Sequence, residues 1–459
     1  MKLSTKLFLS LAVLLASCGR EFLDLKRNAN QVIPATLQDY QAILDYNYIM
    51  NQSASHMLGL IGSDEYYVVD EALESVLWPF QRNAYIWSQD DVFQGEESAD
   101  WNRAYQRILY ANLALEAREL SPAAVDKNLW NNIVGSALFF RSINHYQLLQ
   151  LFAKPYDAST AATDPGIPIR IDYDVTLKSP RHSVADVYAQ IIKDLEEAIE
   201  LLPQAAVNPF RPNKAAACTL LARCYMQMHN YEGAERVTNL GLSFSPGILD
   251  YETLDFSYPY TFPADYGISN PEILFFCTTD YIDILAEPRF NADSSLYSSY
   301  EQHDLRRRAY FNRSDDGRTL FKGAYSGQSS GILFTGLTTS ELWLMRAECR
   351  ARLGNVQGAL DDLNSLLKNR YDKSHFVALK AQDRSEALAL ILSERRKELY
   401  MRGIRWEDLR RLNNDSDFAT TLKRRLGGHE YKLLPGDSRW VWPIPQNEIE
   451  LSGLEQNDR

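Results

Sequence analysis

The chain has 459 residues, of which 45% are hydrophobic, 12% aromatic and 24% charged. These fractions are typical of a globular protein and exclude a collagen-like, fibrous or largely disordered chain. There are 48 Lys and Arg residues against 60 Asp and Glu residues, so the net charge is −12. We expect no nucleic acid as a partner, because binding to phosphate backbones depends on Lys and Arg.

The N-terminal residues have the features of an exported lipoprotein. Lys2 and Lys6 precede an apolar stretch over residues 7–16, which has the length of a secretory signal and is too short to span a bilayer. The next residues, Leu15-Ala16-Ser17-Cys18, resemble a bacterial lipobox. We therefore expect a lipoprotein signal peptide over residues 1–17, with Cys18 as the lipidation site that anchors the mature chain to a membrane. A plain signal peptide or a buried first helix remains the alternative.

Amphipathic segments with small residues at regular positions predict tetratricopeptide-like helix pairs, in which small residues let two helices approach closely. The predicted fold class is mostly α, with about four such pairs supporting a single domain over residues 18–459. The pairs are Ala137 to Leu151 with Val187 to Leu202, Cys218 to Pro246 as two helices, Trp343 to Leu366 as two helices, and Ser385 to Met401 with Arg405 to Leu412.

Two long segments without helical periodicity interrupt this frame, near residues 62–99 and 245–336. Both are rich in aromatic residues, which argues against disorder, and long ordered loops are usually functional. Aromatic rings stack on the apolar faces of sugars or on peptide side chains. We therefore expect ligand contacts from Tyr66, Trp78, Trp87, Tyr281 and Tyr297. Packing inside the protein is the alternative for each ring, as it is for Tyr67, Tyr300 and Tyr325.

Other polar and sulfur-containing residues are interpreted as structural. The four cysteines after Cys18 lack the spacing of a metal site and are expected to be free and buried. Charges in the segment from Glu394 to Arg411 recur at helical spacing, as in Glu394 with Lys397 and Glu398 with Arg402. We expect them to lock the last helical pair together.

The sequence contains no motif for a known catalytic site. There is no HExxH, G-x-S-x-G or P-loop, and the seven histidines have no ligand spacing. Asp315-Asp316-Gly317 lacks the rest of a calcium-binding loop. We predict no enzymatic activity, no metal and no cofactor. A pair of catalytic carboxylates for glycoside hydrolysis is not excluded, because such a pair is defined by its distance in space and not by its spacing in the sequence.

Several segments, taken in order, resemble one family. They are Cys18 to Asp24, Pro34 to Tyr40, Glu394 to Leu399, Arg402 to Arg411 and Trp442 to Ile449. Together with the lipobox and the repeats, they resemble the SusD/RagB family of nutrient-uptake outer-membrane lipoproteins over nearly the whole mature chain.

The resemblance implies a lipoprotein of the outer membrane that faces the cell exterior. Such a protein captures oligosaccharides and acts as a lid on a SusC-like TonB-dependent transporter. The same role with peptides is the nearest alternative, and a surface glycan hydrolase is the alternative from another class.

Overall fold

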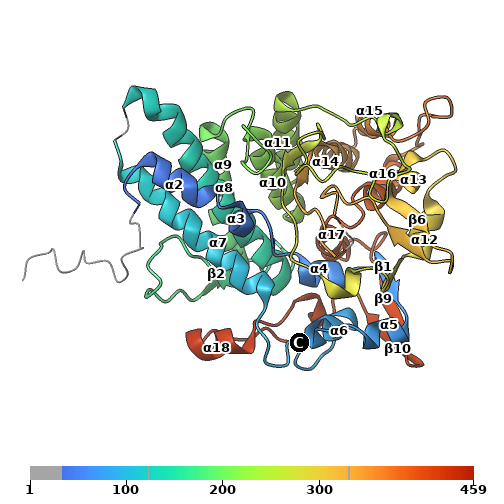
Figure 1. Ribbon diagram of the computed structural model, residues 1–459, viewed down its shortest axis with the longest axis horizontal. Helices are drawn as coiled ribbons and strands as arrows, with labels where there is room; N and C mark the ends of the chain where they lie inside the picture. The colour runs from blue at the N-terminus through green and yellow to red at the C-terminus, as the bar shows by residue number, and fades with distance from the viewer. Residues whose placement is uncertain (1–33, 122, 329–330) are drawn as a thin grey trace, which may run out of the picture.

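The computed structural model describes residues 34–121, 123–328 and 331–459, so Cys18 and the expected signal peptide lie outside the described residues. Helices form the frame of the molecule, and they stack in chain order across Figure 1. The frame helices are α7 (Ala99–Leu115), α8 (Lys127–Phe152), α9 (Val184–Leu201), α10 (Lys214–Gln227), α11 (Tyr231–Phe244), α14 (Thr339–Arg352), α15 (Val356–Leu367) and α16 (Arg384–Glu398). The mostly α fold class is confirmed.

Three of the predicted pairs pack as antiparallel neighbours: α8 with α9, α10 with α11, and α14 with α15. The second helices of the last two pairs begin in the same way. The side chains of Asn230 and Asn355 each accept a hydrogen bond from the backbone N–H three residues later. Gly241 is the expected small contact, because a Cβ there would lie 3.1 Å from side-chain atoms of both Cys218 and Leu342.

The fourth predicted pair forms two helices, but they do not pack chiefly on each other. The second of them, α17 (Arg405–Leu412), packs against α4 (Met57–Gly62), while α16 packs on α14 and α15. Gly62 permits this contact, because a Cβ there would lie 2.8 Å from ring carbons of Trp406 and Trp442. The ring of Trp406 therefore fills a space next to α4 that glycine leaves open.

The two irregular segments contain only short elements. The first holds β1 (Tyr66–Val68), α5 (Asp70–Glu74) and α6 (Pro79–Tyr85), and the second holds β4 (Ile273–Phe275), β5 (Phe290–Ala292), α12 (Ser294–Ser299), α13 (Leu305–Tyr310), β6 (Phe311–Arg313) and β7 (Thr319–Phe321). Strands β1 and β5 pair antiparallel, with Tyr66 opposite Ala292 and Val68 opposite Phe290. This sheet joins the two segments, although more than 200 residues separate them.

The remaining elements surround the frame. They are α2 (Leu37–Leu44), α3 (Asn47–Met50), β2 (Pro165–Pro168), β3 (Arg181–Ser183), β8 (Leu337–Thr338), β9 (Leu422–Leu426), β10 (His429–Leu433) and α18 (Gln446–Ser452). Helices α6 and α18 lie at the same end of the molecule, at the bottom of Figure 1. None of the helices within the described residues is both long and apolar enough to cross a bilayer.

The expected role of the charged segment is confirmed in part. Arg395 on α16 pairs with Asp408 on α17 at 2.7 Å, and Glu394 pairs with Lys397 at 2.7 Å. The expected pair of Glu398 with Arg402 is wrong. Glu398 instead accepts hydrogen bonds from Arg370, whose Nη2 lies 2.8 Å from its Oε1. The guanidinium of Arg402 stacks on the ring of Tyr325, 3.5 Å from its centroid.

The cysteine prediction is confirmed for Cys218, Cys224, Cys277 and Cys349, which are free and buried. Cys218 and Cys224 both lie on α10, which points them in different directions. Burial raises the pKa of the Cys277 thiol to about 11. These thiols therefore stay protonated and act as small apolar side chains.

A buried carboxyl group predicts how stability changes with pH. Burial raises the pKa of Glu407 to about 7, and the hydroxyl of Tyr146 donates a hydrogen bond of 2.7 Å to it. Between about pH 4.5 and pH 7 the folded chain keeps this proton, while the unfolded chain loses it. The free energy of unfolding therefore falls as the pH rises through this range.

Glu407→Gln should flatten this slope, because glutamine carries no titrating proton. Urea unfolding of both proteins at several pH values measures the effect. Burial raises the pKa of Glu65 to about 7 as well, so part of the slope should remain. Equal slopes for the variant and the parent chain would contradict the assignment to Glu407.

Candidate functional site

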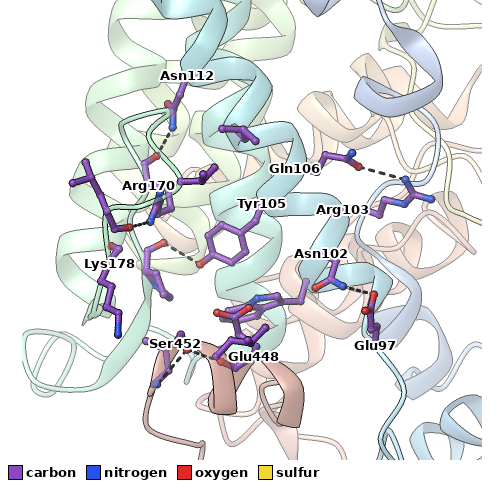
Figure 2. Close-up of a pocket in the computed structure, with 18 of the residues that line it drawn as sticks. Glu97, Asn102, Arg103, Tyr105, Gln106, Asn112, Arg170, Lys178, Glu448 and Ser452 are labelled. Carbon is purple, nitrogen blue, oxygen red and sulfur yellow. Dashed lines mark hydrogen bonds between the residues drawn. The ribbon is translucent and has the colours of Figure 1, made fainter. Parts of the chain in front are cut away.

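A cavity of about 940 Å³ lies between α7, the loop over residues 168–179 and α18. Figure 2 shows side chains from all three segments around it. Its lining includes Glu97, Trp101, Asn102, Arg103, Tyr105, Gln106, Leu109, Asn112, Arg170, Val175, Leu177, Lys178, Asp280, Glu448, Leu451 and Leu454. A volume of this size matches pockets that bind small ligands.

Hydrogen bonds from α7 hold the loop that forms one wall. The hydroxyl of Tyr105 donates to the carbonyl of Pro168 at 3.0 Å, and Nδ2 of Asn112 donates to the carbonyl of Arg170 at 3.1 Å. The guanidinium of Arg170 in turn donates to the carbonyls of Asp174, at 2.7 Å, and Leu177. The loop is thus held together by the side chain of Arg170 and is hydrogen-bonded to α7.

Charged groups of both signs face the cavity. Arg103, Lys178, Asp280 and Glu448 line it, and none of the four forms an ion pair with another described residue. Nδ2 of Asn102 donates to Glu97 at 2.8 Å, which places an amide and a carboxylate together at one end (Figure 2). Such groups are suited to hydrogen bonds with hydroxyl and amide groups of a ligand.

Several other lining residues are apolar. Val175 and Leu177 on the loop and Leu451 on α18 are exposed, and the ring of Trp101 contacts that of Tyr105 at a centroid distance of 5.0 Å. The cavity therefore combines apolar surfaces with many polar groups that can fix the orientation of a ligand.

Two of the predicted aromatic residues, Trp78 and Tyr281, are exposed, although neither lines the cavity. Trp78 immediately precedes α6 and is 49% exposed, and Tyr281 is 46% exposed. Asp280, which precedes Tyr281, lines the cavity, and the backbone N–H of Leu77 donates to Asp283 at 2.8 Å. The hydrogen bond joins the two irregular segments, and Asp280 brings the second of them to the cavity. We call Trp78 and Tyr281 the aromatic patch.

A glycine sets the position of one ring of the patch. A Cβ at Gly331 would lie 2.4 Å from a ring carbon of Tyr281, so the ring rests directly on the backbone there. The backbone N–H of Ile282 donates to the carbonyl of Gly331 at 2.8 Å and fixes the same contact. Tyr281 is therefore held in place before any ligand arrives.

The structure places Tyr66 and Trp87 in the core, where they are 4% and 1% exposed. The hydroxyl of Tyr66 donates to the carbonyl of Ile61 at 3.0 Å, and Nε1 of Trp87 donates to the carbonyl of Gly62 at 2.9 Å. The guanidinium of Arg424 lies 5.4 Å from the first ring and 4.6 Å from the second. These two rings are part of the hydrophobic core and present no face to a ligand. Tyr300 and Tyr325 are buried in the same way.

Tyr297 is half-buried and already in contact with neighbouring side chains. Its ring centroid lies 5.3 Å from that of Phe311 in an edge arrangement and 4.9 Å from the guanidinium of Arg307. The ring is thus covered in part by a cation. Of the five predicted residues, the structure leaves Trp78 and Tyr281 as the exposed candidates.

The residues that line the cavity were missed by the sequence analysis. Asn102 and Arg103 lie on a helix, Lys178 on the loop between α8 and α9, and Glu448 on α18. The one available signal was the long connection between Leu151 and Val187, whose length indicates a functional loop. Nothing in the sequence shows that α18 packs beside it.

Comparison with known proteins places this chain in one family. Residues 21–226 match a SusD-like family described as "Starch-binding associating with outer membrane", and residues 309–459 match the SusD/RagB family, described as "SusD family". The chain belongs to the SusD/RagB family. The resemblance drawn from the sequence motifs is thereby confirmed.

One curated relative of this SusD/RagB chain is "SusD-like protein P2" from Formosa agariphila. It is 31% identical over 140 residues, which cover 30% of this chain and 26% of the relative. The match thus spans about a quarter of the relative's length.

Solved SusD-type structures share the fold at low sequence identity. A putative sugar binding protein from Bacteroides vulgatus is 22% identical, with a TM-score of 0.74 over 93% of this chain and 99% of that chain. A SusD superfamily protein from Bacteroides thetaiotaomicron is 22% identical, with a TM-score of 0.71 over 93% and 100%. A surface glycan-binding protein A from Bacteroides fluxus is 18% identical, with a TM-score of 0.69 over 92% and 99%.

Proposed function

We propose that this SusD/RagB chain captures oligosaccharides at the outer surface of the outer membrane and binds them without chemical change. The observation that carries the proposal is the cavity of about 940 Å³, which is lined by apolar groups and by charged groups without ion pairs among the described residues, and whose lining residue Asp280 precedes Tyr281 of the aromatic patch. Relatives described as sugar-binding and glycan-binding support the choice of ligand class.

The chemistry of the site suits a short carbohydrate chain. The faces of Trp78 and Tyr281 offer stacking surfaces to pyranose rings, and Asn102, Arg103 and Glu448 offer hydrogen bonds to hydroxyl groups. The Tyr281 ring rests on the backbone of Gly331 before binding, which lowers the entropic cost of ordering it.

Peptides are the second ligand class that the cavity accommodates. Arg103, Lys178, Asp280 and Glu448 line the cavity and have no ion-pair partners among the described residues. They could pair with the ends or side chains of a peptide, whereas a neutral glycan would engage them only through hydrogen bonds.

A binding assay separates these alternatives. The soluble chain, expressed without residues 1–18, is titrated calorimetrically with neutral oligosaccharides, charged oligosaccharides and peptide mixtures, and each ligand is then analysed for cleavage. We expect saturable binding of an oligosaccharide, with the ligand recovered intact. Binding of peptides and of no oligosaccharide would show that the ligand class is peptide. Release of shorter products would show that the protein is a hydrolase.

The proposal includes a membrane anchor and a transporter. Residues 1–17 are the signal peptide, Cys18 carries the lipid, residues 18–459 form one domain, and a SusC-like TonB-dependent transporter receives the ligand beneath this lid. Tethering both proteins to one membrane raises their effective concentration, so a modest affinity between them suffices.

Replacing Cys18 with alanine should release the chain from the membrane fraction, and the transporter should still co-purify with the native lipoprotein in detergent. Fractionation and mass spectrometry of the purified complex measure the two effects. A Cys18→Ala chain that stays in the membrane fraction would contradict the lipid site. Recovery of the lipoprotein alone, with outer-membrane barrels kept folded, would contradict the partner.

A further inference from the structure

The structure brings together two histidines that lie 72 positions apart in the sequence. The rings of His303 and His375 are stacked face to face, with centroids 3.7 Å apart and an angle of 2° between their planes. The carboxylate of Asp372 lies beside them, with Oδ2 3.2 Å from Nδ1 of His375. One ligand atom from each of the three residues lies within 4.8 Å of the other two.

Backbone pairing fixes the two segments that carry these side chains. The N–H of Asp372 donates to the carbonyl of His303 at 3.0 Å, and the N–H of Leu305 donates to the carbonyl of Arg370 at 2.8 Å. Asp304 and Tyr371 form an antiparallel bridge between these two bonds. His303 and Asp372 therefore lie at one end of a short, hydrogen-bonded ladder, and the N–H of His375 donates to the carbonyl of Asp372 at 2.9 Å in the turn that follows.

The ladder is anchored in the core by buried ion pairs. Arg306 pairs with Asp304 at 2.7 Å, and Arg370 pairs with Glu398 at 2.8 Å, all four side chains being fully buried. The backbone on both sides of the cluster is thus held by the protein interior. A site supported in this way keeps its ligands close together even when it is empty.

The carboxylate of Asp372 is oriented by its neighbours. Its Oδ1 accepts hydrogen bonds from the backbone N–H of Ser374, at 3.0 Å, and from the hydroxyl of Ser374, at 2.6 Å. The ammonium of Lys373 is turned towards Asp250 and Glu252 instead, with a separation of 3.2 Å from Glu252. The adjacent positive charge is therefore neutralised away from the three side chains.

We propose that His303, Asp372 and His375 bind a divalent transition-metal ion of the zinc type. Two imidazoles and one carboxylate are a ligand set used by Zn²⁺, Co²⁺, Ni²⁺ and Cu²⁺, whereas Ca²⁺ and Mg²⁺ prefer oxygen ligands only. The residues are half-buried or exposed, so water completes the coordination. The bound ion joins the second irregular segment to the chain after α15.

Binding changes the arrangement of the two rings. In parallel rings the nitrogen lone pairs lie in separate planes, so one ring turns before both nitrogens point at a single ion. The side chain of His375 is 49% exposed and has room for this rotation. In the metal-bound state the two imidazole rings are therefore no longer stacked, and each directs one nitrogen to the ion.

Calorimetric titration with ZnCl₂ tests the site, using the soluble chain without a histidine tag after treatment with a chelator. We expect one Zn²⁺ per chain and a higher melting temperature with the ion. His303→Ala, His375→Ala and Asp372→Asn should each weaken binding by at least about tenfold and remove the thermal shift. His429→Ala is the matched control, because His429 is exposed on β10 and should leave Zn²⁺ binding unchanged.

Circular dichroism and the melting temperature without metal establish that each variant is folded. Titration with CaCl₂ should give no comparable binding. Absence of Zn²⁺ binding in the parent chain would overturn the proposal. It would also be overturned if the three variants bound Zn²⁺ as tightly as the parent chain, or if His429→Ala alone removed binding.

Discussion

Replacing Trp78 and Tyr281 with alanine should weaken oligosaccharide binding by about 1–3 kcal/mol for each ring, a scale taken from bases stacked on aromatic side chains. Each ring is about half-exposed, so its removal takes away a stacking face without opening a cavity in the core. Calorimetric titration of the single and double variants with the best ligand measures the loss. The melting temperature should stay close to that of the parent chain.

Tyr258→Ala is the matched control for this experiment. Tyr258 is 61% exposed and belongs to the same irregular segment as Tyr281, but neither it nor its sequence neighbours line the cavity, whereas Asp280 next to Tyr281 does. Its removal should leave affinity unchanged. Wild-type affinity in both single variants and the double variant would contradict the assignment of the aromatic patch, whereas an equal loss in Tyr258→Ala would show that the effect is not local.

Replacing Arg370 with alanine should destabilise the fold by about 3–5 kcal/mol, the range measured when one partner of a buried ion pair is removed. The guanidinium pairs with Glu272 at 2.6 Å and with Glu398 at 2.8 Å, and it stacks on Tyr251 at 4.1 Å. Its loss leaves two buried carboxylates without this cation. Urea unfolding at neutral pH measures the change.

An exposed ion pair provides the comparison. Arg425 and Glu430 lie 3.3 Å apart on the hairpin of β9 and β10, where the Arg425 side chain is 84% exposed. Arg425→Ala should change stability by less than about 1 kcal/mol. If both arginine variants lost the same small amount, the buried cluster would not hold the second irregular segment to the frame.

A second group of buried ion pairs, formed by Glu348 with Arg352 and Arg411, predicts a loss of stability in acid. Ion pairing with Arg411 and Arg352 outweighs burial and lowers the pKa of Glu348 to about 2. Its stabilising charge is present above pH 4.5, where the unfolded chain is also ionised, and is lost as the pH falls towards 2. This effect is opposite in sign to that of Glu407 and dominates in a lower pH range.

The helix pairs of this fold can be predicted from sequence because the residues that specify each pair lie close together in the chain. The small residues at Ala234 and Gly241, the turn before Asn355 and the aromatic positions all lie within one repeat. Three of the four helix pairs formed as predicted for this reason. The packing of α17 on α4 depends on Gly62, more than 340 positions away, and no local pattern carries that information.

The candidate site was predictable only in part for the same reason. The composition of the irregular segments indicated aromatic candidates, yet burial separates Trp78 from Trp87 within one segment. That separation depends on Arg424, which contacts the ring of Trp87 from the other end of the chain. The cavity and the stacked pair of His303 and His375 likewise arise from segments that only the fold brings together.

The central claim is that the cavity between α7 and α18, with the aromatic patch, is the glycan site. A crystal structure of the soluble chain with its best oligosaccharide tests this most directly. The account predicts sugar rings stacked on Trp78 or Tyr281 and hydroxyl groups within hydrogen-bonding distance of Asn102, Arg103 or Glu448. Sugar bound on another face of the molecule, with these five side chains uncontacted, would contradict it.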